Sequence, residues 1–175
     1  MKPHLAKLVM QGLKKANVRV VCALPDTLLK GVYEAAANDP EMRYILVTNE
    51  AEGAAVTAGA YAGGKRSVLI MENSGLRAAC EALARIGLVN TLPVVMLMGY
   101  RGEVGERWHW GVNHGITMEP LLQALRIPYL MVDREESIVS SVERAVIHGV
   151  SSQYHSAVVF RYPLVEDDKM ARPAP

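Results

Sequence analysis

Two acidic residues, Glu50 and Glu52, lie in the segment TNEAEG, just before a run rich in Ala and Gly. Carboxyl groups of this kind can exchange protons with a bound ligand. A carboxylate in the first turn of a helix is also favoured by the helix dipole, so an acidic helix start without further function is the simplest alternative. The run that follows contains Gly53 and Gly59, and glycine costs about 1 kcal/mol in a helix interior. These glycines indicate close approach by another backbone or by a ligand.

A second segment, MENSGL, places Asn73, Ser74 and Gly75 at a predicted turn from strand to helix. Glycine at such a turn allows a backbone to approach a ligand closely. The segment contains neither GxGxxG nor GxxxxGK followed by Ser or Thr, so it carries no nucleotide signature. The structural alternative is that Asn73 or Ser74 caps the helix that follows.

The segment GYRGEVG, residues 99–105, is followed by both tryptophans of the chain, Trp108 and Trp110, and by two of its five histidines, His109 and His114. A solvated loop seldom needs this composition. Tryptophan and arginine are enriched in buried interfaces, so a subunit contact competes with an active-site cover. The residues alone leave both interpretations open.

Strand-like and helix-like patterns alternate along the chain. Apolar, β-branched runs predict six strands, at residues 18–23, 44–47, 67–71, 93–98, 129–132 and 157–161. Helical spacing and capping residues predict six helices, at residues 4–16, 26–38, 50–62, 73–89, 117–125 and 135–150. Asp26 is the expected cap of the second helix. Residues 99–115 have no clear period and are predicted to form the longest loop.

This alternation is typical of an α/β fold, with a doubly wound, mainly parallel six-stranded sheet and helices on both faces. The pattern predicts one domain over residues 1–166 and a flexible tail at 167–175. Ligands of such sheets bind where the strands end. The segments of interest are therefore those that carry Asp26, Glu50 and Asn73, together with the loop at 99–115.

Composition argues against several classes of function. The formal charge of +1 gives no reason to expect nucleic acid or an anionic membrane as partner. No apolar run reaches the roughly 18 residues needed to span a bilayer, and no signal peptide is predicted. Cys22 and Cys80 lie far apart and outside any CxxC, which predicts reduced core thiols in a cytoplasmic protein. The chain has no HExxH or paired CxxC for a metal and no GxSxG nucleophile elbow.

The stretch NEAEGAAVTAGAYAGGKRSVLIMENSGL resembles the pyrimidine-binding domain of thiamine-diphosphate enzymes. The matching features are Glu50 at the start of a small-residue helix, Gly59 nine positions on, and then a strand. The segments ENSGL and GYRGEVG are similar to those of phosphonopyruvate decarboxylases and of sulfopyruvate decarboxylase alpha subunits. LPDTLLKGV resembles the first active-site loop of that family, and the resemblance spans most of residues 18–165. One departure is Arg77-Ala78, where a smaller and more neutral pair is usual.

The resemblance implies a thiamine-diphosphate-binding fold and assigns Glu50 to atom N1′ of the cofactor's aminopyrimidine ring. It also implies that Asn73, Ser74 and Gly75 contact the cofactor. The expected reaction is the decarboxylation of a 2-oxo acid, in which the thiazolium ring takes up the electrons released with CO₂.

The same resemblance indicates which residues meet the substrate. Asp26, together with His109 or His114, is expected to handle protons on the substrate.

Thr27, Arg101 and Arg77 are expected to bind the substrate, because a guanidinium pairs well with an anion such as a sulfonate. Arg101 has a structural alternative, which is to pair with Glu103 or Glu106 of its own loop. The alternative for Arg77 is a surface position on a helix.

The GDG motif with which these enzymes hold Mg²⁺ and the diphosphate does not occur in the 175 residues. The resemblance therefore implies a beta subunit that carries GDG, in at least an α₂β₂ assembly. The expected function is the alpha subunit of a sulfopyruvate decarboxylase. Phosphonopyruvate or another short 2-oxo acid is the alternative substrate, and a non-catalytic partner-binding module of the same fold is the alternative function.

Overall fold

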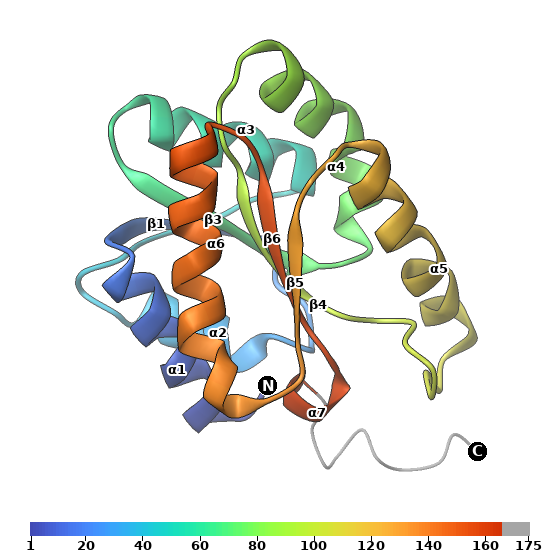
Figure 1. The fold of residues 1–175 in the computed structure, drawn as a ribbon. Coiled ribbons are helices and arrows are strands. Elements are labelled where there is room, and N and C mark those ends of the chain that lie inside the picture. Colours follow the sequence, from blue (N-terminus) through green and yellow to red (C-terminus); the bar gives the residue numbers. More distant parts are fainter. Residues whose placement is uncertain (166–175) are drawn as a thin grey trace.

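All six strands expected from short apolar runs are present in the computed structural model, which describes residues 1–165 (Figure 1). They are β1 Val18–Ala23, β2 Arg43–Leu46, β3 Arg66–Glu72, β4 Val95–Gly99, β5 Tyr129–Val132 and β6 Ser156–Phe160. Every pair is parallel, and the order across the sheet is β2-β1-β3-β4-β6-β5. The predicted doubly wound α/β sheet is therefore confirmed.

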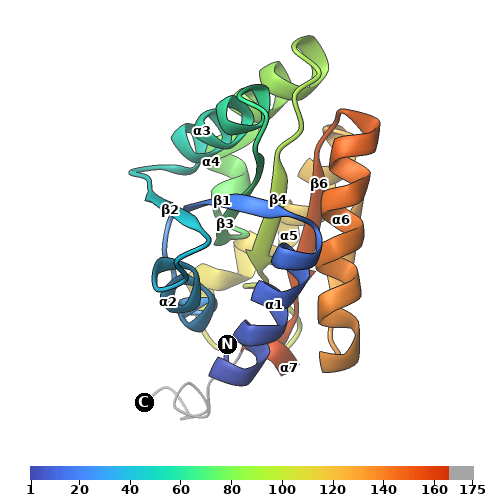
Figure 2. The same cartoon turned by 90° about the vertical axis from the view of Figure 1, so that its left-hand side faces the viewer.

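Helices cover both faces of the sheet, and each face has its own core. The helices α1 Pro3–Lys15, α2 Lys30–Ala37 and α6 Ile138–Ser152 pack on one face, whereas α3 Glu50–Ala62, α4 Gly75–Ala84 and α5 His109–Ala124 pack on the other (Figure 2). Successive residues of a strand point to opposite faces. In β3, Val68 and Ile70 accordingly enter the first core, and Leu69 and Met71 enter the second.

The strand order reverses direction between β1 and β3. From β1 the chain moves outward to β2, then returns to β3 on the other side of β1. In open parallel sheets this switch point leaves a crevice at the carboxyl ends of the two strands. The segment after β1 carries Asp26, and the segment after β3 carries Asn73, so both lie beside that crevice.

One helix begins earlier than predicted. α5 starts at His109, where a loop was expected up to residue 115 and a helix only from Thr117. Only Gly111, Met118 and Leu122 of this helix are buried, so it shows no apolar stripe that a sequence pattern could reveal. Its first turns are held by tertiary contacts with the loop after β4, described below.

Two capping predictions were also wrong in detail. Ser74 makes no cap hydrogen bond at the start of α4, and the Asn73 side chain binds the loop after β4 instead. Asp26 caps a turn rather than a helix, because its Oδ1 accepts from the backbone N–H groups of Leu28 at 2.5 Å and Leu29 at 2.9 Å, and α2 begins only at Lys30.

The helices predicted over residues 73–89 and 135–150 each contain a short turn of another type, a π-helical turn Arg85–Val89 after α4 and a 3₁₀ turn Glu135–Ser137 before α6. The short helix α7 Tyr162–Val165 was not anticipated. The tail predicted at residues 167–175 lies outside the described residues. Within residues 1–165, no helix has the length and apolarity required to cross a membrane.

Candidate active site

The Glu52 side chain takes part in capping the N-terminus of helix α3. Its Oε2 accepts hydrogen bonds from the backbone N–H and the hydroxyl of Thr48, both at 2.7 Å, and its own N–H donates to Asn49 Oδ1 at 2.9 Å. This is a reciprocal cap of the helix N-terminus. The hydrogen bonds from Thr48 lower the pKa of the exposed Glu52 carboxyl. Of the two acids in TNEAEG, Glu52 therefore has a structural role.

Glu50, the first residue of α3, reaches across to the start of α4. Its half-buried side chain lies directly over Gly75. A Cβ atom at position 75 would stand 2.6 Å from Oε1 and 2.7 Å from Cδ of Glu50, so the Glu50 side chain would have to move to make room for it. Gly75 thus leaves the space that the Glu50 carboxyl occupies between two helix N-termini.

The two glycines that follow Glu50 differ in their surroundings. A Cβ at Gly53 would meet Leu69 at 2.6 Å and Val47 at 3.3 Å, so this glycine lets α3 pack closely on the sheet. A Cβ at Gly59 would meet nothing within 4 Å. The close approach expected from Gly53 is found inside the chain, whereas no contact among residues 1–165 explains Gly59.

Asp26 lies at the switch point with both carboxyl oxygens engaged. Beyond the backbone bonds to Oδ1, its Oδ2 accepts from the hydroxyl of Tyr33 in α2 at 2.6 Å. Burial raises the pKa of Asp26, the hydrogen bonds from Tyr33 and the backbone oppose this, and the nearby Glu72 carboxylate adds to the rise. Asp26 is therefore a fixed carboxyl group whose ionised form is less favoured than usual.

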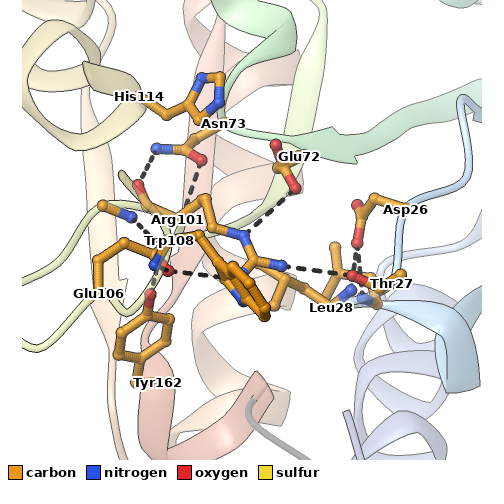
Figure 3. A network of polar contacts seen from close by, with 12 residues as sticks. Asp26, Thr27, Leu28, Glu72, Asn73, Arg101, Glu106, Trp108, His114 and Tyr162 are labelled. Carbon is orange, nitrogen blue, oxygen red and sulfur yellow. Dashed lines mark hydrogen bonds and ion pairs between the residues drawn. The ribbon is translucent and has the colours of Figure 1, made fainter. Parts of the chain in front are cut away.

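Arg101 is the centre of a polar network that joins three loops (Figure 3). Its side chain is only 4% exposed, its Nε lies 3.7 Å from Glu72 and one terminal nitrogen lies 3.6 Å from Glu106. The other terminal nitrogen donates to the hydroxyl of Thr27 at 3.3 Å, and the guanidinium carbon lies 5.1 Å from the ring centre of Trp110. The structure thus places Arg101 against Glu106 of its own loop, with the exposed Thr27 beside it.

Asn73 fixes the backbone of the same arginine. Its Nδ2 donates to the carbonyl of Arg101 at 2.9 Å, and the N–H of Arg101 donates to its Oδ1 at 3.0 Å. Asn73 is 1% exposed, and both its amide nitrogen and its amide oxygen join the loops after β3 and β4. Ser74 and Gly75 follow directly and form the start of α4.

Glu106 closes the loop after β4. It accepts from the N–H groups of Gly102 at 2.9 Å and Trp108 at 3.1 Å, and from the hydroxyl of Tyr162 in α7. Burial alone would raise the pKa of Glu106, but these hydrogen bonds and the charge of Arg101 hold the pKa below its ordinary value. Glu106 is therefore a buried carboxylate that stays ionised.

Backbone contacts hold this loop against the first turns of α5. Gly102 has φ +90°, and a Cβ there would collide with the backbone of Gly111 and Gly115. A second anchor is Glu103, which pairs with Arg161 and accepts from the backbone N–H of Tyr162 at 3.3 Å. The segment 99–115 is thus an ordered loop and helix start built around Arg101.

The structure separates the two candidate histidines. His109 is exposed at the first position of α5, whereas His114 is half-buried near the charged side chains of Glu72, Arg101 and Glu106 (Figure 3). The Nδ1 atom of His114 lies 2.6 Å from a terminal nitrogen of Arg77 in α4, and its ring meets the ring of Trp110 edge-on with centres 6.0 Å apart. Arg77 is exposed, so its side chain crosses the surface between α4 and α5.

Sequence reasoning did not single out three residues of this cluster. Glu72 had a recognisable signal, since it is a charge placed directly after the buried strand residues VLIM. Tyr33 and Tyr162 had none, because the fold of a turn brings Tyr33 to Asp26 and a distant segment brings Tyr162 to Glu106. Among residues 1–165, no three His, Cys, Asp or Glu side chains are placed to hold a metal ion together.

The sequence profile of a known family, "Thiamine pyrophosphate enzyme, N-terminal TPP binding domain", matches residues 3–125. The chain belongs to this family. The match includes Asp26, Glu50, Asn73 and Arg101, whereas Tyr162 of the polar cluster lies beyond it.

Sequence relatives extend the match to nearly the whole chain. The sulfopyruvate decarboxylase subunit alpha of Methanococcus maripaludis is 27% identical over 95% of this chain and 99% of its own length. The subunit of the same name from Methanothermobacter thermautotrophicus is 33% identical over 74% of this chain and 78% of its own length. The phosphonopyruvate decarboxylase of Streptomyces viridochromogenes is 34% identical over 57% of this chain, which corresponds to 25% of that enzyme.

Solved structures agree on the fold. The 2-oxoglutarate:ferredoxin oxidoreductase of Magnetococcus marinus superposes with a TM-score of 0.72 over 92% of this chain at 18% sequence identity. The present chain spans 29% of that much longer protein. This likeness confirms the expected thiamine-diphosphate-binding fold.

Proposed function

We propose that this chain is the catalytic alpha subunit of a two-chain thiamine-diphosphate-dependent decarboxylase that converts sulfopyruvate to sulfoacetaldehyde and CO₂. The observation that carries the proposal is the Glu50 carboxyl, which lies over Gly75 between the starts of α3 and α4. Family membership and the names of the two alpha-subunit relatives support the reaction class.

The residues present fit the aminopyrimidine end of the cofactor. Glu50 can share a proton with a ring nitrogen, and Gly75, which has no side chain, leaves the room that the Glu50 carboxyl needs at this end of the site. Thiamine diphosphate, when bound, supplies the electron sink for the electrons released with CO₂. Ser74 and the backbone at Gly75 lie beside Glu50 and are proposed to line this end of the cofactor, with Asn73 holding them in place.

The diphosphate end needs a second chain. The sequence lacks GDG, so we assign the diphosphate and Mg²⁺ to a beta subunit that carries this motif. The exposed face of α3, formed by Ala55, Gly59 and Ala62, has little bulk and would let another subunit approach closely. This supports at least an α₂β₂ assembly. A cytoplasmic location, expected from the free thiols of Cys22 and Cys80, is part of the proposal.

The substrate is proposed to bind between Asp26 and His114, at the strand ends. Thr27 points its hydroxyl to the same region. Arg101 is paired with two carboxylates of the chain, so we assign it the task of holding the loops. Arg77 is exposed and has N–H donors beyond the one that faces His114, which makes it the better candidate for the sulfonate.

Phosphonopyruvate is the second candidate substrate. The similarity to the Streptomyces viridochromogenes enzyme favours it, since 34% of 99 aligned residues are identical. Both substrates carry a second anion besides the carboxylate, so both fit a site with an accessible arginine.

Reconstitution tests the proposal. The chain is expressed alone and together with a candidate GDG-bearing beta chain, and CO₂ release from sulfopyruvate, phosphonopyruvate and pyruvate is measured with thiamine diphosphate and Mg²⁺. We expect no turnover by the chain alone, and turnover by the pair that is fastest with sulfopyruvate. Robust turnover by the chain alone contradicts the two-chain proposal, and an inactive pair contradicts the decarboxylase proposal.

A further inference from the structure

The contact between Arg77 and His114 fixes where the imidazole proton lies. One terminal nitrogen of Arg77 stands 2.6 Å from Nδ1 of His114. A guanidinium has only N–H donors and keeps its proton in proteins, so it cannot accept a hydrogen bond. Nδ1 must therefore accept, and the proton of the neutral ring lies on Nε2.

We infer that Arg77 is a positioning residue that keeps His114 neutral, with its proton on Nε2, so that His114 acts as a hydrogen-bond donor and not as an imidazolium acid. The identity of the acceptor rests on the proposed function: it is the oxygen of the substrate's 2-oxo group. The state of the imidazole ring itself rests only on the contact with Arg77.

The charges around His114 come from three segments. Glu72 ends strand β3, Arg77 lies on α4, and Arg101 and Glu106 lie on the loop after β4. Burial is the main cause that lowers the pKa of His114, and the charges of Arg77 and Arg101 lower it further, against the two carboxylates. The lowered pKa means that the neutral ring predominates at pH 7, since an ordinary histidine has a pKa of about 6.5.

A neutral imidazole suits an oxygen that gains negative charge during the reaction. Its Nε2–H is a weak acid, so it donates a hydrogen bond without transferring the proton, and that bond strengthens as charge builds on the oxygen. The Trp110 ring lies at a steep angle to the imidazole with ring centres 6.0 Å apart, which favours one orientation of the imidazole. Arg77 thus selects the proton position, and Trp110 favours one direction for Nε2–H.

Nitrogen NMR of the histidine rings tests the inference on the full chain. We expect His114, assigned by the loss of its signals in His114→Gln, to show an unprotonated Nδ1 and a protonated Nε2 at pH 7. His155 is an internal reference, because its Nδ1 accepts from the N–H of Val94 at 2.9 Å and its Nε2 faces the carbonyl of Leu83 at 2.8 Å. A protonated Nδ1 on His114 at pH 7 overturns the inference, whether or not the chain proves to be a decarboxylase.

Variants of Arg77 and Arg85 separate the effect of Arg77 on His114 from the effect of removing any exposed arginine. Arg77→Leu removes the donor and the charge, so His114 should become protonated at a higher pH than in the wild type. Arg77→Lys keeps both and should restore the wild-type titration. The control is Arg85→Leu, which removes an exposed arginine that pairs with Glu81 at 2.7 Å. If His114 titrates identically in Arg77→Leu and the wild type, Arg77 does not hold its state.

Kinetics of the reconstituted pair test the donor role. Removing a hydrogen bond to a developing oxyanion lowers kcat by about 10²-fold to 10³-fold. We expect a loss of that size in His114→Leu with a much smaller change in KM, and a partial recovery in His114→Gln, whose amide can still donate. Equal activity of His114→Leu and the wild type removes His114 from the reaction.

Discussion

The side-chain amide of Asn73 binds both backbone groups of Arg101, with one hydrogen bond of 2.9 Å and one of 3.0 Å. Because the pair is buried, each bond that is lost leaves a backbone group without a partner. This relationship ties the start of α4, where Gly75 makes room for Glu50, to the loop that carries Glu106.

Asn73→Ala should destabilise the chain by about 1–3 kcal/mol, because it leaves the N–H and the carbonyl of Arg101 unsatisfied. Urea unfolding measures the change. The matched control is Asn38→Ala, which removes an exposed side-chain bond to the carbonyl of Glu34 and should change stability by less than about 0.5 kcal/mol. Equal effects of the two substitutions would contradict the role given to Asn73.

Gly75→Ala should lower the activity of the reconstituted pair, whereas Gly59→Ala should raise the stability of the isolated chain. A Cβ at position 75 displaces the Glu50 carboxyl, so we expect activity of the reconstituted pair to fall by at least tenfold, or roughly 1.4 kcal/mol in the barrier. A Cβ at position 59 meets nothing within 4 Å in the described part of the chain, so Gly59→Ala should stabilise the isolated chain by about 0.4–1 kcal/mol.

The same Gly59 variant also tests the assembly. If the exposed face of α3 lies against another subunit, the added methyl group should weaken association, measured by analytical ultracentrifugation of the pair. Unchanged association of Gly59→Ala would place the interface elsewhere.

Glu106→Gln should destabilise the chain by about 2–3 kcal/mol at pH 7, since a buried carboxylate loses its charge-assisted bonds to Tyr162 and two backbone N–H groups. The pKa of Glu106 is lowered in the folded chain. Its contribution is therefore fully present above the unfolded pKa of about 4.3 and is lost as the pH falls through the lower folded pKa.

Urea unfolding at pH 7 and at pH 4 checks this dependence. The gap between wild type and Glu106→Gln should narrow at the lower pH. Glu81→Gln serves as control, because it removes only an exposed pair with Arg85 and should have a small effect at both values. A gap that widens on acidification would contradict an ionised Glu106.

Arg101→Lys and Arg77→Ala should differ in how they change kcat/KM for sulfopyruvate relative to pyruvate. Arg101 is committed to Glu72 and Glu106, so Arg101→Lys should lower kcat/KM equally for sulfopyruvate and pyruvate. Arg77→Ala should lose about 1.5–3 kcal/mol more on sulfopyruvate if Arg77 reads the sulfonate, because pyruvate lacks that anion. If Arg101→Lys instead lowered kcat/KM for sulfopyruvate more than for pyruvate, Arg101 would be the residue that binds the sulfonate.

Much of the fold could be predicted because its causes are local. The buried strands are continuous apolar runs. Helix α3 begins after Asn49 and ends before Gly63, and both are ordinary capping residues. The start of α5 could not be predicted, because its first turns depend on the backbone contact of Gly102 with Gly111 and Gly115, which no periodicity records.

The candidate site divides in the same way. Asp26, Glu50 and Asn73 stand at strand ends, which the alternating pattern locates. The distinction between Glu50 and Glu52 needed the structure, because both acids suit a helix start and only the contacts with Gly75 and Thr48 separate them. Glu106 was an expected partner of Arg101, whereas the contacts of Arg101 with Glu72 and Thr27 join distant segments, which no local pattern records.

The measurement that tests the central claim most directly is hydrogen–deuterium exchange at C2 of thiamine diphosphate in the reconstituted pair. Glu50→Gln keeps a hydrogen bond but cannot share a proton, so it should slow the exchange by at least about 10²-fold while the subunits still associate. Glu52→Gln, which alters only the helix cap at Thr48, should leave the exchange rate close to that of the wild type. An unchanged rate in Glu50→Gln, or a greater loss in Glu52→Gln, would contradict the assignment of Glu50 to the cofactor.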